Sequence, residues 1–404
     1  MTIVDRARPE SGARTPAFPK LLPIVDPEGV PGAEFLEEVR GILASKQLTN
    51  GAFVKKFEEA AAEYLGVAHC VAVSSCTAGL LLVLKALELR GQVILPSFTF
   101  HATAHAVVWN GLTPVFADCD AKTFCVAPQA VRGQVSSRTA AILGVHLFGN
   151  PAAVKELDEI AAGLQIPLVF DAAHAFGSSS GAKCVGGFGT AEVFSFSPTK
   201  LVVAGEGGLV ATRDAGLAEK LRAARNYGDA GNYDPEVLGV NARLSEINAA
   251  MALHGLTALD ARIERRNEIR LRYERKLGDV AGLRFQEVSE GGHSTFKDFS
   301  VIVDEKEFGH SRDWLVERLH AENIGARKYF SPPVHRQKLY SAMWDGRALP
   351  LTDLISDGVV SLPIYSSLTD ESVDKVCEVI RRGAGTGQCK MGQVGYGGCL
   401  KHES

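Results

Sequence analysis

The sequence predicts an α/β protein in which a mostly parallel sheet of about seven strands forms a large domain and a smaller α+β domain follows it. Two observations support this prediction. Between residues 67 and 212, short apolar runs alternate with stretches of helical periodicity, and most of the runs are apolar or β-branched throughout, as in a sheet covered on both faces. Polar side chains also stand where several runs end, which is where parallel sheets bind their ligands.

The chain begins with a segment rich in proline, glycine and charge, residues 1–30, which we expect to be an extended arm. Residues 33–65 then show two helical patterns separated by a turn at Leu48-Thr49-Asn50-Gly51. Helices are expected between the strands of the next region, for example over Ala78–Leu89 and Ala152–Gly163. The seven expected strands are Cys70–Ser74, Val93–Pro96, Thr113–Ala117, Ala140–His146, Ile166–Asp171, Glu192–Phe196 and Gly208–Thr212.

A long helical stretch over residues 244–277 is expected to link the two domains, because no proline or late glycine interrupts it after Gly255. We therefore expect a large domain over residues 31–258 and a small domain over residues 259–383. The small domain has strand candidates at Thr295–Val303 and Val359–Leu362 and helix candidates at Arg312–Glu322 and Glu371–Arg382. The glycine-rich composition of residues 384–404 predicts a disordered tail.

Composition and charge exclude several classes of function. The chain has 404 residues and a net charge of −4 with scattered basic residues, which argues against a nucleic-acid partner. No apolar run approaches the roughly 20 residues that cross a bilayer, and the N-terminus lacks the apolar core of a signal peptide. We therefore expect a cytoplasmic protein without membrane association. The eight cysteines form no Cys-x-x-Cys pair, and no metal-ligand cluster is seen, so no metal is expected.

The residue with the most specific chemistry is Lys200, which follows the apolar run Val193–Phe196 and two small hydroxyl residues. A lysine at this edge of a sheet can be stripped of water, which lowers the pKa of its ammonium group and frees the lone pair. Asp171 ends a neighbouring apolar run. A lysine that forms a Schiff base and a carboxylate that meets a pyridinium nitrogen are what a pyridoxal phosphate (PLP) enzyme needs. Taken singly, a solvated loop lysine and a helix-capping aspartate are the commoner explanations.

A phosphate site is predicted at Ser75, Cys76 and Thr77, which follow a strand and start a helix. Free backbone N–H groups and the helix dipole favour an anion there, although a plain helix N-cap is the alternative. Phe100 follows the next strand and could stack on a pyridine ring or belong to the core. His174, three residues after Asp171, could donate a hydrogen bond to the ring oxygen of the cofactor or be a satisfied core histidine.

Together these motifs resemble those of the DegT/StrS-type sugar aminotransferases, which are PLP enzymes of fold type I, like aspartate aminotransferase. The resemblance covers residues 30–382. The segments that carry it are Ser75–Ala78, Pro96–Phe100, Val145–Gly149, Asp171–Ala175, Ser195–Lys200, Gly205–Gly208, Gly239–Arg243 and Tyr329–His335. Within the family, the turn at residues 48–51, Asp-Ala-Ala-His and Arg327–Pro332 are most similar to the C4 aminotransferases of the desosamine-pathway type, which act on dTDP-4-keto-6-deoxyglucose.

The resemblance implies a role for each candidate residue. Lys200 would bond covalently to PLP, and Asp171 would pair with the pyridine nitrogen. Phe100 would stack on the ring, and His174 would face the ring oxygen. Ser75, Cys76, Thr77 and Ser195 would hold the phosphate. Asn241 would reach that phosphate from the neighbouring subunit, so that a homodimer would be required for catalysis.

Two positions depart from the common family pattern, and both departures bear on the subgroup more than on the reaction. Many relatives have glycine where Cys76 stands and glutamine where His174 stands. A dehydratase branch replaces the lysine with histidine, so the presence of Lys200 favours transamination.

The reaction that the resemblance implies is the amination of a nucleotide-linked keto-sugar with glutamate as the amino donor. Thr49, Asn50, Tyr329 and His335 are candidates for sugar or nucleotide contacts through the resemblance alone, and surface polar residues are the alternative for each. A PLP aminotransferase for a 3-keto nucleotide sugar or a cyclitol ketone remains open. So does a regulatory protein of the same fold without turnover, although the presence of both Lys200 and Asp171 argues against it.

Overall fold

The computed structural model describes residues 15–27 and 32–384. The predicted tail from residue 385 on, residues 1–14 of the predicted arm, Cys389 and Cys399 lie outside the described residues. The described part of the arm contains one bridge, between Leu22 and Ile324, and buries Phe18 in the C-terminal core. Across the described ranges, no helix is both long and apolar enough to cross a membrane.

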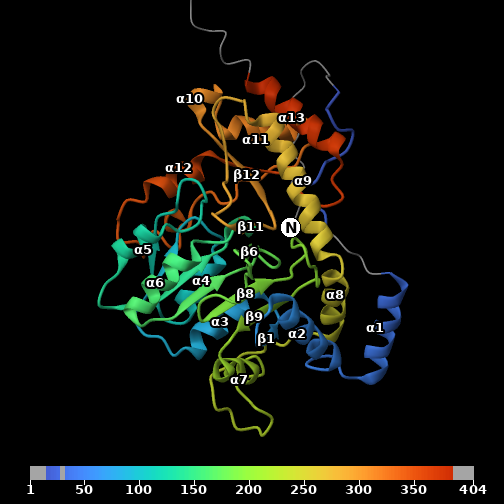
Figure 1. Cartoon of the computed structure of the whole chain (residues 1–404), viewed down its shortest axis with the longest axis vertical. Helices are drawn as coiled ribbons and strands as arrows, with labels where there is room; N and C mark the ends of the chain where they lie inside the picture. Colours follow the sequence, from blue (N-terminus) through green and yellow to red (C-terminus); the bar gives the residue numbers. More distant parts are fainter. Residues whose placement is uncertain (1–14, 28–31, 385–404) are drawn as a thin grey trace, which may run out of the picture.

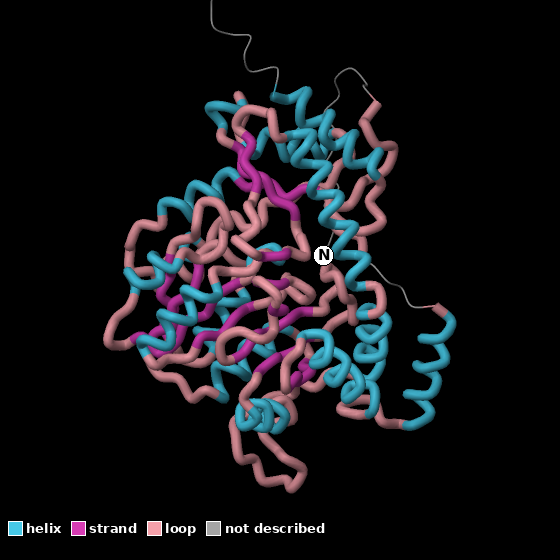
Figure 2. Tube along the Cα trace, viewed as in Figure 1, coloured by secondary structure: helices cyan, strands magenta, loops and turns pink. Residues whose placement is uncertain are grey.

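The predicted α/β fold is confirmed. The central sheet has seven strands in the order β1-β9-β8-β5-β4-β2-β3, and β9 alone runs antiparallel to its neighbours. Figure 2 shows these strands as a band with helices on both sides. The strands are β1 (His69–Val73), β2 (Gln92–Pro96), β3 (Thr113–Ala117), β4 (Thr139–Val145), β5 (Leu168–Asp171), β8 (Ala191–Ser195) and β9 (Gly208–Thr212).

Alternate residues of these strands face opposite helix layers, which explains their unbroken apolar runs. In β2, Val93 and Leu95 belong to the core under one layer, whereas Ile94 belongs to the core under the other. The first layer consists of α3 (Cys76–Ala86), α4 (Ala102–Trp109) and α7 (Ala215–Ala224). The second consists of α2 (Ala52–Leu65), α5 (Pro128–Gln134), α6 (Val154–Leu164) and α8 (Glu246–Leu256).

The C-terminal part is built on a smaller antiparallel sheet, in the order β10-β12-β13. Its core includes Ile269, Tyr273 and Leu277 of α9, the long helix that Figure 1 shows running up to α13. The elements of this part are α9 (Leu259–Leu277), β10 (Leu283–Phe285), β12 (Phe299–Val303), α10 (Glu305–Phe308), α11 (Arg312–Ala321), α12 (Pro350–Gly358), β13 (Val359–Leu362) and α13 (Asp370–Ala384).

The remaining elements are peripheral. A small sheet, β11-β6-β7, pairs a strand before β12 with the hairpin that follows β5, and two single turns of 3₁₀ helix follow β4 and precede α12. In Figure 1, α1 stands away from the body next to α8. The bounds are α1 (Ala33–Ser45), η1 (Leu147–Gly149), β6 (Ser179–Ser180), β7 (Lys183–Cys184), β11 (Gly292–His293) and η2 (Val334–Arg336).

Three expected elements differ from the structure. The helix expected over residues 244–277 is two helices, α8 and α9, because the Thr257 hydroxyl donates to the His254 carbonyl at 2.8 Å and ends α8. Strand β5 begins at Leu168 and not at Ile166, since Pro167 has no N–H for the ladder. Strand β12 begins only at Phe299, because residues 294–298 bond to the large sheet's loops instead of to a strand.

Candidate active site

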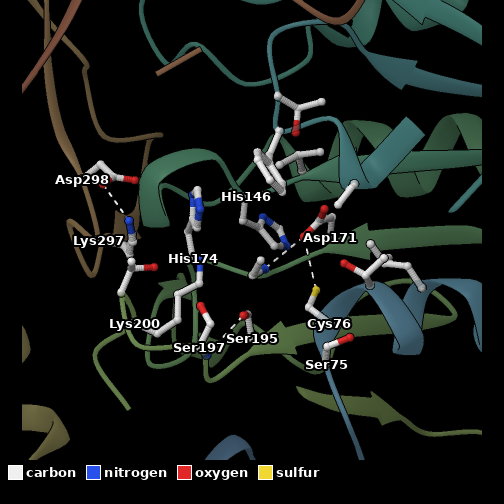
Figure 3. Close-up of a pocket in the computed structure, with 18 of the residues that line it drawn as sticks. Ser75, Cys76, His146, Asp171, His174, Ser195, Ser197, Lys200, Lys297 and Asp298 are labelled. Carbon is white, nitrogen blue, oxygen red and sulfur yellow. Dashed lines mark hydrogen bonds and ion pairs between the residues drawn. The ribbon is translucent and has the colours of Figure 1, made fainter. Parts of the chain in front are cut away.

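The predicted pocket lies where the carboxyl ends of the parallel strands meet the segment before β12. It has a volume of about 300 Å³. The loops after β1, β2, β5 and β8 supply one side of its lining, and Lys297, Asp298, Tyr329 and Phe330 supply the other. Figure 3 shows Lys200, His174, Asp171 and Cys76 around one space, with Lys297 and Asp298 at its edge. Parallel strands direct their ends to one edge of the sheet, so residues far apart in sequence converge there.

Lys200 lies in the turn after β8, where its backbone N–H donates to the Ser197 carbonyl at 3.0 Å. The side chain reaches into the pocket beside His174 and Lys297. Burial lowers the pKa of the Lys200 ammonium to about 8, and the positive charge of Lys297 acts in the same direction. About a tenth of this lysine is therefore a neutral amine at pH 7, against less than about a thousandth for a lysine in water, and the neutral amine is the form that attacks an aldehyde.

Asp171 ends β5 at the base of the pocket and is 6% exposed. The Thr103 hydroxyl donates to its Oδ2 at 2.7 Å, and the Ala173 backbone N–H donates to its Oδ1 at 3.1 Å. These donors fix the plane of the carboxylate. A fixed buried carboxylate can hold a proton on a ring nitrogen, because an adjacent negative charge raises the pKa of a pyridinium.

His174 lies on the same wall as Lys200. Burial lowers the pKa of His174 well below its usual value, and the charges of Lys200 and Lys297 lower it further. The ring is therefore neutral. Its Nδ1 accepts a hydrogen bond from the Phe148 backbone N–H at 3.2 Å, so the proton of the neutral ring is on Nε2. Nε2 can then act as a donor, which is the property that the sequence prediction required.

The start of α3 forms the other end of the pocket. The Ser75 hydroxyl caps the helix by accepting from the Ala78 N–H at 3.1 Å, and the N–H groups of Cys76 and Thr77 belong to the unpaired first turn. Ser195 lines the same pocket. Gly208 of β9 lies directly against this turn, and a Cβ there would stand 2.4 Å from the Ser75 carbonyl carbon. The turn is thus held against the sheet with its N–H groups free for an anion.

Cys76 also touches the carboxylate. Its Sγ lies 3.7 Å from Asp171 Oδ1 and 3.4 Å from the Val193 carbonyl oxygen. Burial raises the pKa of the Cys76 thiol well above its usual value, and the charge of Asp171 raises it further, so the sulfur stays protonated.

Aromatic side chains form the outer wall. Phe100 lines the pocket and is 47% exposed, and its ring centroid lies 6.0 Å from that of Phe330. Tyr329 lines the same wall. An exposed aromatic face at the pocket edge is suited to stacking on a planar ligand.

Four other predicted ligands do not line this pocket in the described part of the chain. Thr49 pairs with Ser245 in a bridge, and Asn50 is exposed beside it. Asn241 is exposed and pairs with Asn226. His335 is fully buried elsewhere. Its Nδ1 lies 2.7 Å from the Ser97 hydroxyl, its Nε2 lies 3.3 Å from Asp353, and its ring packs on Trp344. His335 therefore acts as a structural histidine, and the expectation that it contacts a sugar is not supported.

Sequence reasoning missed three residues of the site. Thr103, which holds Asp171, gives no signal because it lies inside an apolar helix pattern. Lys297 and Asp298 fall inside the strand expected over Thr295–Val303, which predicts no pocket contact for them. A lysine and an aspartate inside an otherwise apolar run, Thr295–Val303, could have drawn attention to them, because paired charges are rarely placed in a strand buried on both faces.

The residues present fit PLP. The free N–H groups of α3 suit its phosphate, and Asp171 suits its ring nitrogen. His174 Nε2–H suits its ring oxygen, and Lys200 is the amine within the same pocket. Among the described residues, no group of histidine, cysteine, aspartate and glutamate side chains could hold a metal ion.

Comparisons with known proteins agree with this fit. The model of the DegT/DnrJ/EryC1/StrS aminotransferase family matches residues 31–381. The dTDP-4-amino-4,6-dideoxy-D-glucose transaminase of Escherichia coli is 32% identical, over 89% of this chain and 98% of its own length. The UDP-N-acetyl-3-dehydro-alpha-D-glucosamine 3-aminotransferase of Acidithiobacillus ferrooxidans is 34% identical, over 86% of this chain and 93% of its own. The crystal structure of DesI in the presence of its TDP-sugar product superposes with a TM-score of 0.87 at 39% identity, and covers 92% of this chain and 95% of that one.

The lowered pKa of Lys200 predicts how the apoprotein takes up PLP with pH. Below the pKa the amine is protonated and cannot attack, so the rate of covalent incorporation should rise as pH approaches 8 and level off above it. The rate is measured from the change in visible absorbance after PLP is mixed with apoprotein. Nα-acetyl-lysine, whose side-chain amine has a pKa of about 10.4, is the control, and its rate of reaction with PLP should keep rising over the same range. A protein rate that follows the control would contradict the lowered pKa.

Proposed function

This chain belongs to the DegT/DnrJ/EryC1/StrS aminotransferase family, and we propose that it aminates C4 of the nucleotide-linked sugar dTDP-4-keto-6-deoxyglucose with glutamate as the amino donor. It is an aminotransferase, and PLP is its cofactor. The choice of acceptor is supported by the similarity to DesI, which was solved in the presence of a TDP-sugar product, together with the Escherichia coli relative, whose name describes a dTDP sugar with its amino group at C4.

Lys200 is the group that moves protons in this proposal. Lys200 would hold PLP through its amine, which would be released when the donor binds. Its Nζ, whose pKa burial lowers to about 8, would then take the proton from the donor's α-carbon, because a base works best when its pKa is near the working pH. In the second half of the reaction the same atom would deliver a proton to the sugar carbon that receives the nitrogen.

Asp171 and His174 hold the site in the state that this chemistry requires. When bound, PLP supplies an electron sink, which accepts the electron pair left behind as the α-proton departs. The Asp171 carboxylate, fixed by Thr103 and Ala173, would keep a proton on the ring nitrogen, and the protonated ring accepts electrons more strongly. The neutral His174 donates from Nε2 without adding a positive charge next to Lys200.

A second acceptor, a nucleotide sugar with its ketone at C3, is favoured by one observation. The relative from Acidithiobacillus ferrooxidans is as similar to this chain as the Escherichia coli transaminase is, and its name describes a C3 reaction. The catalytic floor of Lys200, Asp171 and His174 would serve either ketone. The aromatic wall of Phe100, Tyr329 and Phe330 is where the two sugars would be distinguished.

We further propose that the enzyme works as a homodimer in which Asn241 completes the phosphate site of the partner subunit. Asn241 is exposed at the end of the loop between α7 and α8, which projects from the body in Figure 1. That loop exposes four large apolar side chains, Tyr227, Tyr233, Leu238 and Val240. Apolar residues gathered on one projecting loop are typical of a surface that a second protein covers.

The acceptor is tested by single-turnover assays. Enzyme loaded with pyridoxamine phosphate is mixed with dTDP-4-keto-6-deoxyglucose, with a 3-keto nucleotide sugar and with a cyclitol ketone, and the return of the PLP absorbance is followed. We expect the 4-keto sugar to react at least about tenfold faster than the others, which corresponds to about 1.4 kcal/mol of transition-state discrimination. A faster reaction with the 3-keto sugar would replace the proposed acceptor with the second one.

The roles of Lys200 and Asp171 are tested by substitution. Lys200→Ala should abolish turnover, and borohydride reduction of the wild-type enzyme followed by peptide mapping should place the pyridoxyl group on Lys200. Asp171→Asn should fold, because an amide still fits beside Thr103, but should lose about a hundredfold or more in kcat. Full activity of Asp171→Asn would show that another group protonates the ring nitrogen. A pyridoxyl group on a different lysine would overturn the assignment of Lys200.

Sharing of the site between subunits is tested by complementation. Lys200→Ala and Asn241→Asp variants, each inactive as a homodimer, are mixed and allowed to exchange subunits. If Asn241 serves the partner, one site of each mixed dimer is intact, and the mixture should regain about one quarter of wild-type activity. If Asn241 serves its own subunit, every site carries one substitution and the mixture stays inactive.

A further inference from the structure

The pocket contains a buried ion pair to which the proposed mechanism assigns no contact with a substrate. Lys297 Nζ lies 2.7 Å from Asp298 Oδ1, and the two side chains are 5% and 3% exposed. Figure 3 shows the pair at the edge of the pocket, on the side opposite Cys76 and Ser75. Both residues line the cavity that also contains Lys200 and Asp171.

This pair does not serve to join parts of the fold. Its two members are neighbours in sequence, so the bond between them crosslinks no separate elements. Removing two charges from water is costly, and buried ion pairs are often replaced by apolar residues with no loss of stability. A charged pair retained at a pocket wall is therefore better explained by what enters the pocket than by folding.

The position of Lys297 is fixed before any ligand arrives. Its backbone N–H donates to the Phe148 carbonyl at 2.9 Å, and its carbonyl accepts from the Arg266 guanidinium at 3.2 Å. Two residues earlier, the Thr295 hydroxyl donates to the His174 carbonyl at 2.7 Å. The ammonium group also lies 5.8 Å from the centre of the Tyr329 ring. A preorganised charge of this kind binds a ligand without an ordering cost.

Lys297 has donors to spare, and the pocket has few other cations. An ammonium group has three N–H bonds, and in the described part of the chain one of them has a hydrogen-bond acceptor, Asp298. Among the described residues that line the pocket, Lys200 and Lys297 are the two lysines and no arginine is present. Lys200 is engaged with the cofactor, and the neutral His174 adds no charge. A glutamate donor carries two carboxylates into a pocket that already contains Asp171, Glu206 and Asp298.

We propose that Lys297 binds a carboxylate of the amino donor and thereby selects an amino acid as the source of nitrogen. This inference rests on the proposed function, since it concerns the donor of that reaction. Asp298 balances the charge of the ammonium group when no donor is bound, and the backbone bonds of Lys297 set its position. Lys297 is thus a specificity-determining residue, and the proton transfers remain with Lys200.

The test removes both charges at once, so that neither is left buried without its partner. In Lys297→Met/Asp298→Asn, the apparent Kd for glutamate should rise about 10- to 100-fold, the value of one charge-assisted hydrogen bond. This Kd is measured in the donor half-reaction, from the loss of PLP absorbance with glutamate and no sugar. Calorimetric titration with glutarate, a dicarboxylate that cannot react, should show the same weakening.

Two matched controls separate carboxylate binding from a structural effect. Asp298→Asn alone leaves the positive charge in place, so glutarate should bind as tightly as to the wild type or more tightly. Lys297→Arg, which keeps the positive charge, should retain most of the wild-type affinity for glutarate. Glutamine, which lacks the γ-carboxylate, and 4-aminobutyrate, which lacks the α-carboxylate, identify the group that is bound. The double variant should lose its preference for glutamate over one of them.

Unchanged glutamate and glutarate affinities in the double variant would overturn the proposal, and so would loss of glutarate binding in Asp298→Asn. Neither result depends on the sugar, because the donor half-reaction and the glutarate titration contain none. A failure of the acceptor assays would refute the proposed acceptor and leave the assignment of Lys297 to be decided by glutarate alone.

Discussion

The site depends on making the neutral amine of Lys200 accessible near neutral pH. A lysine in water is almost fully protonated at neutral pH and cannot attack an aldehyde. Burial at the end of β8 and the nearby charge of Lys297 lower the pKa of this lysine to about 8. The same burial keeps His174 uncharged and Cys76 protonated, so a single cause sets the protonation state of three groups that face one ligand.

That burial exists only because two parts of the chain meet. The ends of the parallel strands provide a floor that would be open to water by itself, and residues 294–298 of the C-terminal part cover it. Backbone and side-chain hydrogen bonds hold this cover to the loops after β4 and β5. They join Lys297 to Phe148, Thr295 to His174, and Thr295 to Ser178. The pocket is therefore formed by the contact between residues 294–298 and the loops of the large sheet. A change in that contact would alter the pKa of Lys200 even where Lys200 itself is unchanged.

The sequence predicted the residues at the strand ends well and the covering residues 294–298 poorly, and the reason is physical. Strand ends follow from apolar runs, and Lys200, Asp171 and Cys76 are polar or small residues at such ends, so local pattern was enough to group them. Residues 294–298 have no regular structure, and their bonds go to residues more than a hundred positions away, such as Thr295 to His174. No local pattern records such a partner. His335 fails in the opposite way. The resemblance places it among the sugar contacts, but its burial against Ser97 and Trp344 results from tertiary contacts that its neighbours in sequence do not reveal.

The separation of the catalytic residues from the aromatic wall also explains how one reaction can be combined with different acceptors. Lys200 and Asp171 lie at or just after the ends of buried strands, and hydrogen bonds hold the side chains of Asp171 and His174, so their chemistry tolerates little variation. Phe100, Tyr329 and Phe330 lie on loops, and they contact a ligand through ring faces, which accept many shapes. A sugar with its ketone at C3 or at C4 presents the same carbonyl to the floor and differs only in how the rest of the molecule meets the wall. We therefore expect relatives that act at C3 and relatives that act at C4 to share Lys200, Asp171 and His174 with this enzyme. They are expected to differ from one another in the loops of the aromatic wall.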